Sequence, residues 1–266
     1  MVMILVLGLA VGAIMAMTGA GGGILAVPLL IFGTGLGLPQ AAPIGLLAVG
    51  MSAALGAALG LKAGLVRYKA ALLMATTGML FAPAGVWLGG RIDNRWLSIL
   101  FAFILLFVAC RAFRQSGSGA AKKQGDPAPP CIRSSDTGRF IWTTRCARAL
   151  ALSGSVAGLL SGLLGVGGGF VIVPALTRSS DLAIQSIVAT SLAVIALVSI
   201  SAVMSSALAG SLDTGVALPF TGGALAGMLA GRLVSTYLAG PQLQKGFAIV
   251  SGMVAIGMIV KSTVNV

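Results

Sequence analysis

Long apolar segments fill most of this chain and alternate with short turns. We expect helices over residues 3–18, 24–33, 41–61, 70–90 and 96–113 in the first half, and over 149–164, 170–176, 183–209, 215–231 and 243–260 in the second. Apolar residues run continuously through these segments instead of alternating with polar ones, which is typical of membrane helices and not of barrel strands. Several of them reach the length of about 20 residues that a helix needs to cross a bilayer.

Two glycine clusters interrupt this apolar sequence at matching places. The first covers Gly19–Gly23 (GAGGG) and the second covers Gly165–Gly169 (GVGGG). A proline follows each cluster at the same distance, as Pro28 and as Pro174. Each glycine inside a helix costs about 1 kcal/mol relative to alanine, so the clusters predict breaks in the helices. Within a membrane, a broken backbone persists only where it is buried in protein or lines a cavity.

The clusters belong to a two-fold internal repeat. Further correspondences join the halves, among them Leu47 with Leu192 and Gly90-Arg91 with Gly231-Arg232. The sequence therefore predicts an all-α, polytopic transmembrane helical bundle of about eight apolar segments. Its two homologous repeats cover residues 1–113 and 149–266, and each opens with a glycine-broken helix.

Basic residues gather between the repeats and suggest a topology. The linker over residues 114–148 is rich in Lys, Arg, Gly, Ser and Pro, and such loops are typical of the cytoplasmic side. If each broken helix pair returns to its starting side, the two repeats are inverted. Of the basic residues outside the linker, three then lie on the opposite side of the membrane and six lie on the linker's side: Lys62, Arg67, Lys69, Arg178, Arg232 and Lys245. The positive-inside tendency favours this arrangement, with both termini opposite the linker.

Composition limits the function classes. Hydrophobic residues are 58%, charged residues are 8% and the mean hydropathy is +1.06, whereas roughly a quarter of the residues in a soluble domain are charged. The net charge of +12 lies in loops and does not indicate nucleic-acid binding. His and Glu are absent, and Cys110, Cys131 and Cys146 show no metal-ligand spacing. We therefore expect no cofactor, no metal, no disulfide framework and no enzyme activity.

The glycine clusters are the candidate binding site. Without side chains, successive backbone N–H groups can converge on an anion, and the half-helix that follows presents its positive N-terminal end. Close helix packing through small residues is the alternative explanation. Hydroxyl groups near the clusters could add contacts, although membrane Ser and Thr more often bond their own helix. The candidates for substrate binding are Gly21, Gly22, Gly23, Gly167, Gly168, Gly169, Thr190 and Ser191, with Thr18 and Ser161 as weaker ones.

At these residues the chain resembles the sulfite exporter TauE/SafE family of bacterial membrane permeases. The resemblance rests on both glycine clusters with Val27-Pro28 and Val173-Pro174, on the paired Gly-Arg motifs, and on Ala189-Thr190-Ser191-Leu192. It implies a multi-pass transporter of the inner membrane that exports sulfite, sulfoacetate or a related small anion. The first half departs from the pattern, because Ile44-Gly45-Leu46-Leu47 stands where the second half has its hydroxyl residues.

We therefore expect a permease whose partners are a small anionic substrate and the lipid bilayer, with no nucleic acid and with a homodimer left open. Import or exchange of another small anion by the same fold is the alternative, and an intramembrane enzyme or a scaffold is less favoured. Gly22→Ala or Gly168→Ala should abolish transport while stability holds. Gly12→Ala, outside the clusters, should change transport little.

Overall fold

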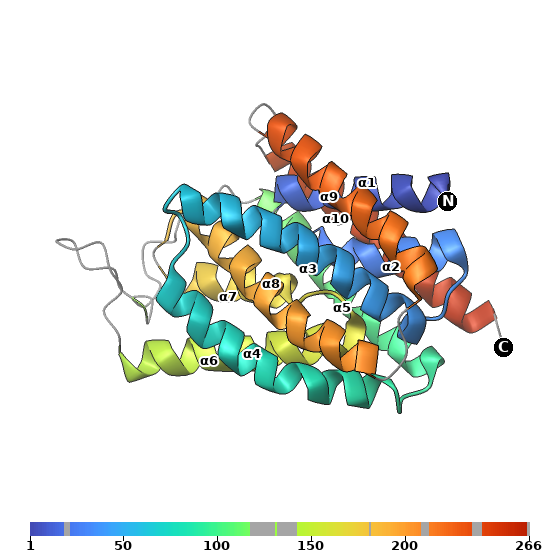
Figure 1. Cartoon of the computed structure of the whole chain (residues 1–266), viewed down its shortest axis with the longest axis horizontal. Coiled ribbons are helices and arrows are strands. Elements are labelled where there is room, and N and C mark those ends of the chain that lie inside the picture. The colour runs from blue at the N-terminus through green and yellow to red at the C-terminus, as the bar shows by residue number, and fades with distance from the viewer. Residues whose placement is uncertain are drawn as a thin grey trace.

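The computed structural model describes residues 1–18, 22–117, 131, 143–180, 182–208, 213–235 and 241–264, and nearly all of them are helical. The helices are α1 (Val2–Thr18), α2 (Gly23–Thr34), α3 (Leu38–Lys62), α4 (Tyr68–Gly89), α5 (Asn94–Gly117), α6 (Thr144–Leu164), α7 (Gly169–Ser179), α8 (Ile184–Leu208), α9 (Thr214–Ser235) and α10 (Pro241–Val264) (Figure 1). The predicted all-α class is confirmed, and each glycine-broken segment forms two helices.

Six helices are long and apolar enough to cross a membrane. They are α3, α4, α5 over residues 94–111, α6, α8 and α9. The helices α1, α2 and α7 are apolar but shorter. The first break lies between α1 and α2, and the second lies between α6 and α7. The chain is thus a multi-pass membrane protein, as its continuous apolar segments predicted.

The first break makes α2 fold back along α1. A Cβ atom on Gly22 would collide with the backbone nitrogen of Met15, and one on Gly33 would collide with the side chain of Leu7. Contacts between position 22 and position 15, and between position 33 and position 7, require an antiparallel helix pair. The first hairpin, α1–α2, therefore returns the chain to the end where it began.

The second break makes a matching hairpin of α6 and α7. A Cβ atom on Gly168 would lie 2.6 Å from the carbonyl oxygen of Ala157, so α7 begins against α6. Three turn residues, Gly165, Gly167 and Gly168, have φ of 75°, 74° and 69°, a backbone conformation that favours glycine. The second hairpin, α6–α7, starts and ends on the side from which α6 enters.

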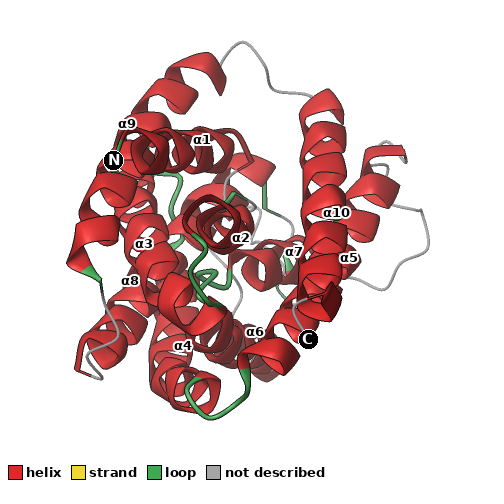
Figure 2. Ribbon diagram, turned by 90° about the vertical axis from the view of Figure 1, so that its right-hand side faces the viewer, coloured by secondary structure: helices red, strands yellow, loops and turns green. Residues whose placement is uncertain are grey.

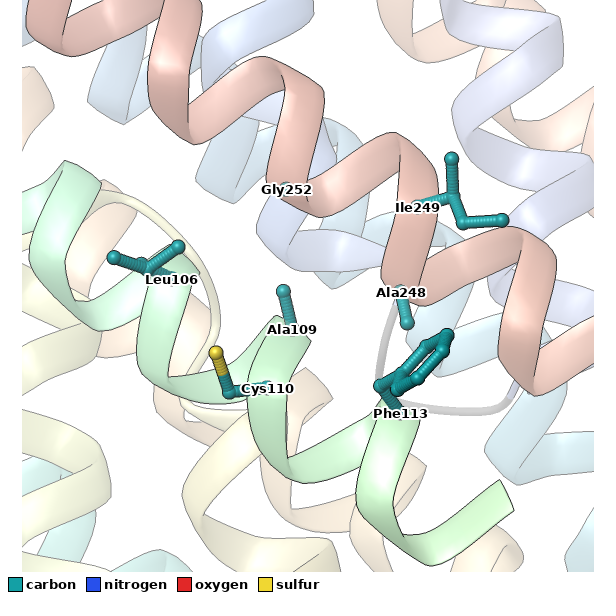
Figure 3. A pocket seen from close by; sticks show the side chains of 7 residues that line it. All are labelled: Leu106, Ala109, Cys110, Phe113, Ala248, Ile249 and Gly252. Atoms are coloured by element: carbon teal, nitrogen blue, oxygen red, sulfur yellow. The ribbon is translucent and has the colours of Figure 1, made fainter. Parts of the chain in front are cut away.

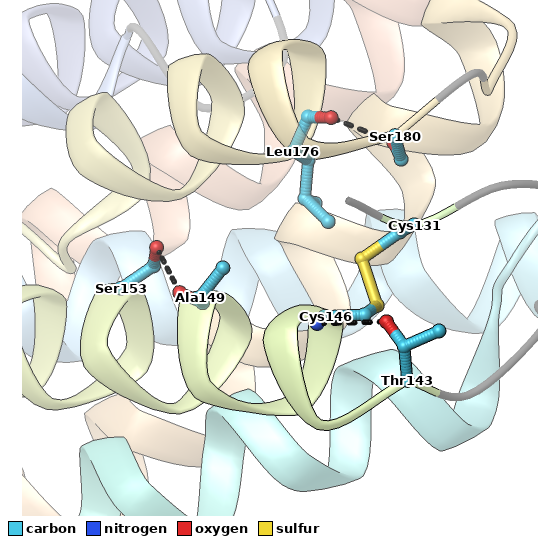
Figure 4. The surroundings of a disulfide bond; sticks show 7 residues. All are labelled: Cys131, Thr143, Cys146, Ala149, Ser153, Leu176 and Ser180. Atoms are coloured by element: carbon cyan, nitrogen blue, oxygen red, sulfur yellow. Dashed lines mark hydrogen bonds between the residues drawn. A yellow bond between two sulfur atoms is a disulfide. The ribbon is translucent and has the colours of Figure 1, made fainter. Parts of the chain in front are cut away.

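A disulfide joins the open end of the second hairpin, where none was expected. Cys131 bonds to Cys146 in the first turn of α6 (Figure 4). The backbone N–H of Cys131 donates to the carbonyl of Ser179 at the end of α7, at 2.9 Å. Both cysteines are fully buried. An odd number of cysteines with no recurring spacing gave no hint of this pair, because the fold and not the sequence brings residue 131 to the hairpin. Cytoplasmic thiols are kept reduced, so the disulfide requires an oxidising environment whereas the predicted cytoplasmic linker would place Cys131 in a reducing one.

Glycine-lined seams hold the hairpins against the bundle. Helix α1 packs parallel to α9, with Gly8 against Phe220 and Gly12 against Ala224. Helix α4 packs parallel to α6 in the same way, with Gly158 against Gly78. Small residues let two helix backbones approach closely, which is the main way that membrane helices associate. Figure 2 shows α1 beside α9 and α4 beside α6.

The helix pairings are the same in both halves when α1–α5 are matched to α6–α10. The pair α1·α9 then corresponds to α6·α4, and the pairs α3·α8 and α5·α10 each correspond to themselves. Figure 1 places the start of α1 and the end of α10 at one end of the molecule and the start of α6 at the other. Inverted repeats require this arrangement, and their orientation in a bilayer stays a prediction.

The small effect of Gly12→Ala on transport stays a prediction, but Gly12 lies in a tight helix contact and makes a poor control for stability. A Cβ atom at Gly12 would collide with the carbonyl oxygen of Ala224, which belongs to the α1·α9 seam. The sequence showed Gly12 inside an apolar run but not which of its faces met another helix.

Adjacent glycines of α9 provide a matched test of this seam. A Cβ atom at Gly223 would collide with the carbonyl oxygen of Leu5, whereas one at Gly222 meets nothing within 4 Å. We expect Gly223→Ala to lower the free energy of unfolding by about 1–3 kcal/mol through overpacking. Gly222→Ala should leave it unchanged or raise it by up to about 1 kcal/mol. Thermal unfolding in detergent measures both, and equal effects of the two variants would contradict the seam.

Candidate functional site

The two glycine breaks meet at Val49 in the middle of the molecule. A Cβ atom at Gly23 would lie 3.1 Å from Val49 Cγ1 and 3.1 Å from the carbonyl oxygen of Val166. A Cβ atom at Gly167 would lie 3.0 Å from the same methyl group and 2.9 Å from Ile195 Cγ2. The two breaks therefore contact each other directly and share one valine side chain, although they are far apart in the sequence.

The meeting point lies at the centre of two crossing helices. Val49 and Ile195 are close to the middle of α3 and α8, each 25 residues long. Gly22, Gly23 and all residues of 165–169 are buried. The breaks therefore form a central region that is closed to solvent from both ends of the molecule.

Two helices, α2 and α7, start at this region with their positive N-terminal ends, and two others, α1 and α6, end there. Gly22 precedes α2 and Gly168 precedes α7, and neither helix has a side-chain cap at its N-terminus. The first N–H groups of a helix have no acceptor within it, and the helix dipole adds roughly half a positive charge at that end. Backbone geometry of this kind favours a small anion.

Packing constrains the same glycines more tightly than the sequence suggested. A Cβ atom at Gly22 would collide with the backbone of Met15, and Gly168 combines a φ of 69° with the close carbonyl of Ala157. The expectation that Gly22→Ala and Gly168→Ala would preserve stability is therefore wrong. Packing accounts for these two positions and leaves the backbone N–H groups of the breaks as candidate ligands. Gly21 lies outside the described residues, and Gly169 is the first residue of α7.

The predicted hydroxyl ligands bond to the protein itself. Thr190 Oγ1 accepts a hydrogen bond from the N–H of Arg67 at 3.1 Å, in the connection between α3 and α4. Ser191 Oγ donates to the carbonyl oxygen of Val188 at 2.8 Å, and Thr18 Oγ1 donates to that of Ile14 at 2.7 Å. These bonds do not reach the breaks, so a substrate contact of Thr190 or Ser191 stays a prediction.

One buried hydroxyl group beside the breaks escaped the sequence analysis. Ser199 Oγ would lie 3.9 Å from a Cβ atom at Gly167 and 3.2 Å from one at Gly50. It has no hydrogen-bond partner among the described residues. Helix α8 carries several serines, and no spacing in the sequence distinguished this one. The weaker candidate Ser161 is likewise buried, with an unpartnered hydroxyl group.

Two charged side chains, those of Asp213 and Arg91, lie at helix ends. Asp213 caps α9, because its carboxylate accepts a hydrogen bond from the N–H of Gly215 at 2.9 Å. Arg91 is exposed and lies over the ring of Trp87 at 4.1 Å, as expected for an arginine at a helix end. No group of metal-ligating side chains occurs in the described part of the chain. Arg67 differs from these two: its Nε is buried without a hydrogen-bond partner among the described residues, and its backbone N–H bonds to Thr190 of α8.

A separate cavity of about 360 Å³ lies between α5 and α10 (Figure 3). Its lining is apolar apart from one thiol: Leu106, Ala109, Cys110, Phe113, Ala248, Ile249 and Gly252. Such a lining suits hydrocarbon and offers an anion neither charge nor strong hydrogen-bond donors. We do not assign substrate binding to this cavity.

Known proteins resemble the chain over nearly its whole length. The family model described as sulfite exporter TauE/SafE matches residues 4–258. A probable membrane transporter protein of Xylella fastidiosa strain 9a5c is 29% identical over 257 residues, which cover 95% of this chain and 92% of that protein. A protein of the same description from strain Temecula1 is 29% identical over 256 residues, with the same coverage. No solved structure matches the chain. The glycine-broken hairpins thus belong to a membrane transporter, and the chain is a member of the sulfite exporter TauE/SafE family.

Proposed function

We propose that this protein exports a small anion across the inner membrane of the cell. Sulfite, sulfoacetate or a related organosulfur or organic anion is the substrate class, and it binds between the two breaks near the membrane midplane. The observation that carries the proposal is the convergence of Gly23 and Gly167 on Val49, where α2 and α7 begin. Secondary transporters commonly bind anions at the N-termini of such half-helices.

The electrostatics of the region suit a substrate that must also leave. Helix N-termini and backbone N–H groups provide partial positive charge without a permanent cation. An arginine or lysine buried at the same place would hold a small anion more tightly and slow its release. The family description supports export of sulfite, whereas the relatives' description names neither substrate nor direction.

Alternating access gives the buried region its route to each side. The two hairpins enter from opposite ends of the bundle and meet at α3 and α8. Movement of one hairpin relative to these helices would open the centre to one side, and movement of the other would open it to the opposite side. Exposed apolar side chains on the outer helices, such as Leu80, Phe103 and Leu218, are 75%, 69% and 71% exposed and would contact lipid.

Cysteine labelling tests the proposed orientation. Ala63 follows the end of α3, Asp93 lies between α4 and α5, and Thr214 starts α9. Inverted repeats with a cytoplasmic linker put Asp93 and Thr214 outside and Ala63 inside. In cells whose protein has its native cysteines replaced by alanine, a membrane-impermeant maleimide should label Asp93→Cys and Thr214→Cys. It should label Ala63→Cys only after permeabilisation.

Two labelling results would contradict this topology. Labelling of Ala63→Cys in intact cells would place the basic loops outside. Protection of Thr214→Cys in cells that expose Asp93→Cys would give the two halves the same orientation.

A transport assay tests the substrate class. Purified protein in vesicles should move sulfite or sulfoacetate faster than protein-free vesicles do, with saturation at high concentration. Thiosulfate and small carboxylates serve as comparison substrates. Uptake into cells driven by the same protein would favour the importer or exchanger instead. If the protein moves none of these anions and cells without it accumulate none, the proposed function is wrong.

A further inference from the structure

Ser199 of α8 departs from the usual behaviour of a serine in a membrane helix. Such a serine normally donates to the carbonyl oxygen three or four residues earlier in its own helix. In α8, Ser191, Ser205 and Ser206 do this, and Ser201 donates to the carbonyl of Met79 in α4. Ser199 is only 2% exposed, yet its hydroxyl group has no hydrogen-bond partner among the described residues. An unpaired hydroxyl group in a buried place is costly, so it requires an explanation.

The position of Ser199 supplies one. Its side chain lies where α8 meets both α3 and the second break, close to Gly50 and Gly167. A Cβ atom at Gly50 would lie 2.6 Å from Ser199 Cβ and 3.2 Å from its Oγ, which shows how closely α3 approaches. Ser199 Oγ would also lie 3.9 Å from a Cβ atom at Gly167. The hydroxyl group is therefore next to the turn from which α7 begins.

Only the second half carries this group. The correspondence of Leu47 with Leu192 places Ala54 of the first half at the position of Ser199. A serine needed only to let helices pack closely could be an alanine in both halves, since alanine is also small. A hydroxyl group at only one of the two matching positions fits a contact made at the second break alone.

We propose that Ser199 is a ligand of the transported anion. Its hydroxyl group donates a hydrogen bond to an oxygen atom of an oxyanion held at the N-terminus of α7, beside Gly167. The proton stays on the serine, and the anion supplies the acceptor that the protein lacks. This inference rests on the proposed function and adds a selectivity element to it, because a hydroxyl donor prefers an oxyanion oxygen to a larger, more weakly accepting halide.

Removal of the hydroxyl group separates binding from folding. Ser199→Ala should raise the half-saturation concentration for sulfite transport by about 10- to 100-fold, the loss expected for one hydrogen bond to a charged ligand. The melting temperature of the ligand-free protein should stay the same or rise, because the variant removes an unpaired buried hydroxyl group. Ser205→Ala is the matched control, since Ser205 bonds its own helix and should change neither value.

Ligand-induced stabilisation gives a readout independent of transport. Sulfite should raise the melting temperature of the wild-type protein in detergent, and chloride should raise it less. Ser199→Ala should need a correspondingly higher sulfite concentration for the same rise. Ser199→Cys, which keeps a similar volume and a weaker donor, should lie between the two, and it decides the question if Ser199→Ala does not fold.

The outcomes distinguish this inference from the proposed function. If the wild-type protein transports sulfite and Ser199→Ala has the same half-saturation concentration and the same stabilisation, Ser199 is not a ligand, while the exporter stands. If no anion is transported by the wild-type protein or stabilises it, the proposed function is wrong and the inference is wrong with it.

Discussion

The demand for hydrogen-bond partners in an apolar medium governs the rest of this structure. A backbone N–H or carbonyl group exposed to lipid costs several kcal/mol, so a membrane protein can break a helix only inside a protein shell. This chain breaks two helices, and every described residue of both breaks is buried. The glycine seams are the consequence: α1 approaches α9, and α4 approaches α6, closely enough to enclose the hairpins. Glycine thus serves twice, once to break a helix and once to bury the break.

The same constraint links the fold to its transport function. A break that is buried by side chains offers its free N–H groups to whatever can reach it, and a small anion is the ligand that such groups favour. The hairpins enter from opposite ends and converge on Val49, which is the arrangement that the proposed alternating access requires. The disulfide between Cys131 and Cys146 closes the open end of the second hairpin. A reducing compartment would open this bond.

Much of the fold could be predicted from the sequence because hydrophobic length and glycine clusters are strong local signals. All ten helices of the described chain overlap expected segments, and the family resemblance at the clusters is confirmed. Side-chain partners could not be predicted, because they depend on which helix faces meet. Gly12 gave no sign of its contact with Ala224, and Thr190 gave none of its bond to Arg67. Ser199 looked like any other serine of α8, and Cys131 pairs with Cys146 only because the second hairpin brings them together.

Accessibility of position 49 tests the central claim most directly, since Val49 contacts both breaks. In a protein with Val49→Cys and its native cysteines replaced by alanine, a small membrane-impermeant maleimide should react from outside in whole cells. The same reagent should react from the cytoplasmic side in inside-out vesicles, and sulfite should slow both reactions. Reaction from both sides with protection by sulfite is the predicted result. Labelling from neither side, or labelling that sulfite leaves unchanged, would contradict a shared transport site at the two breaks.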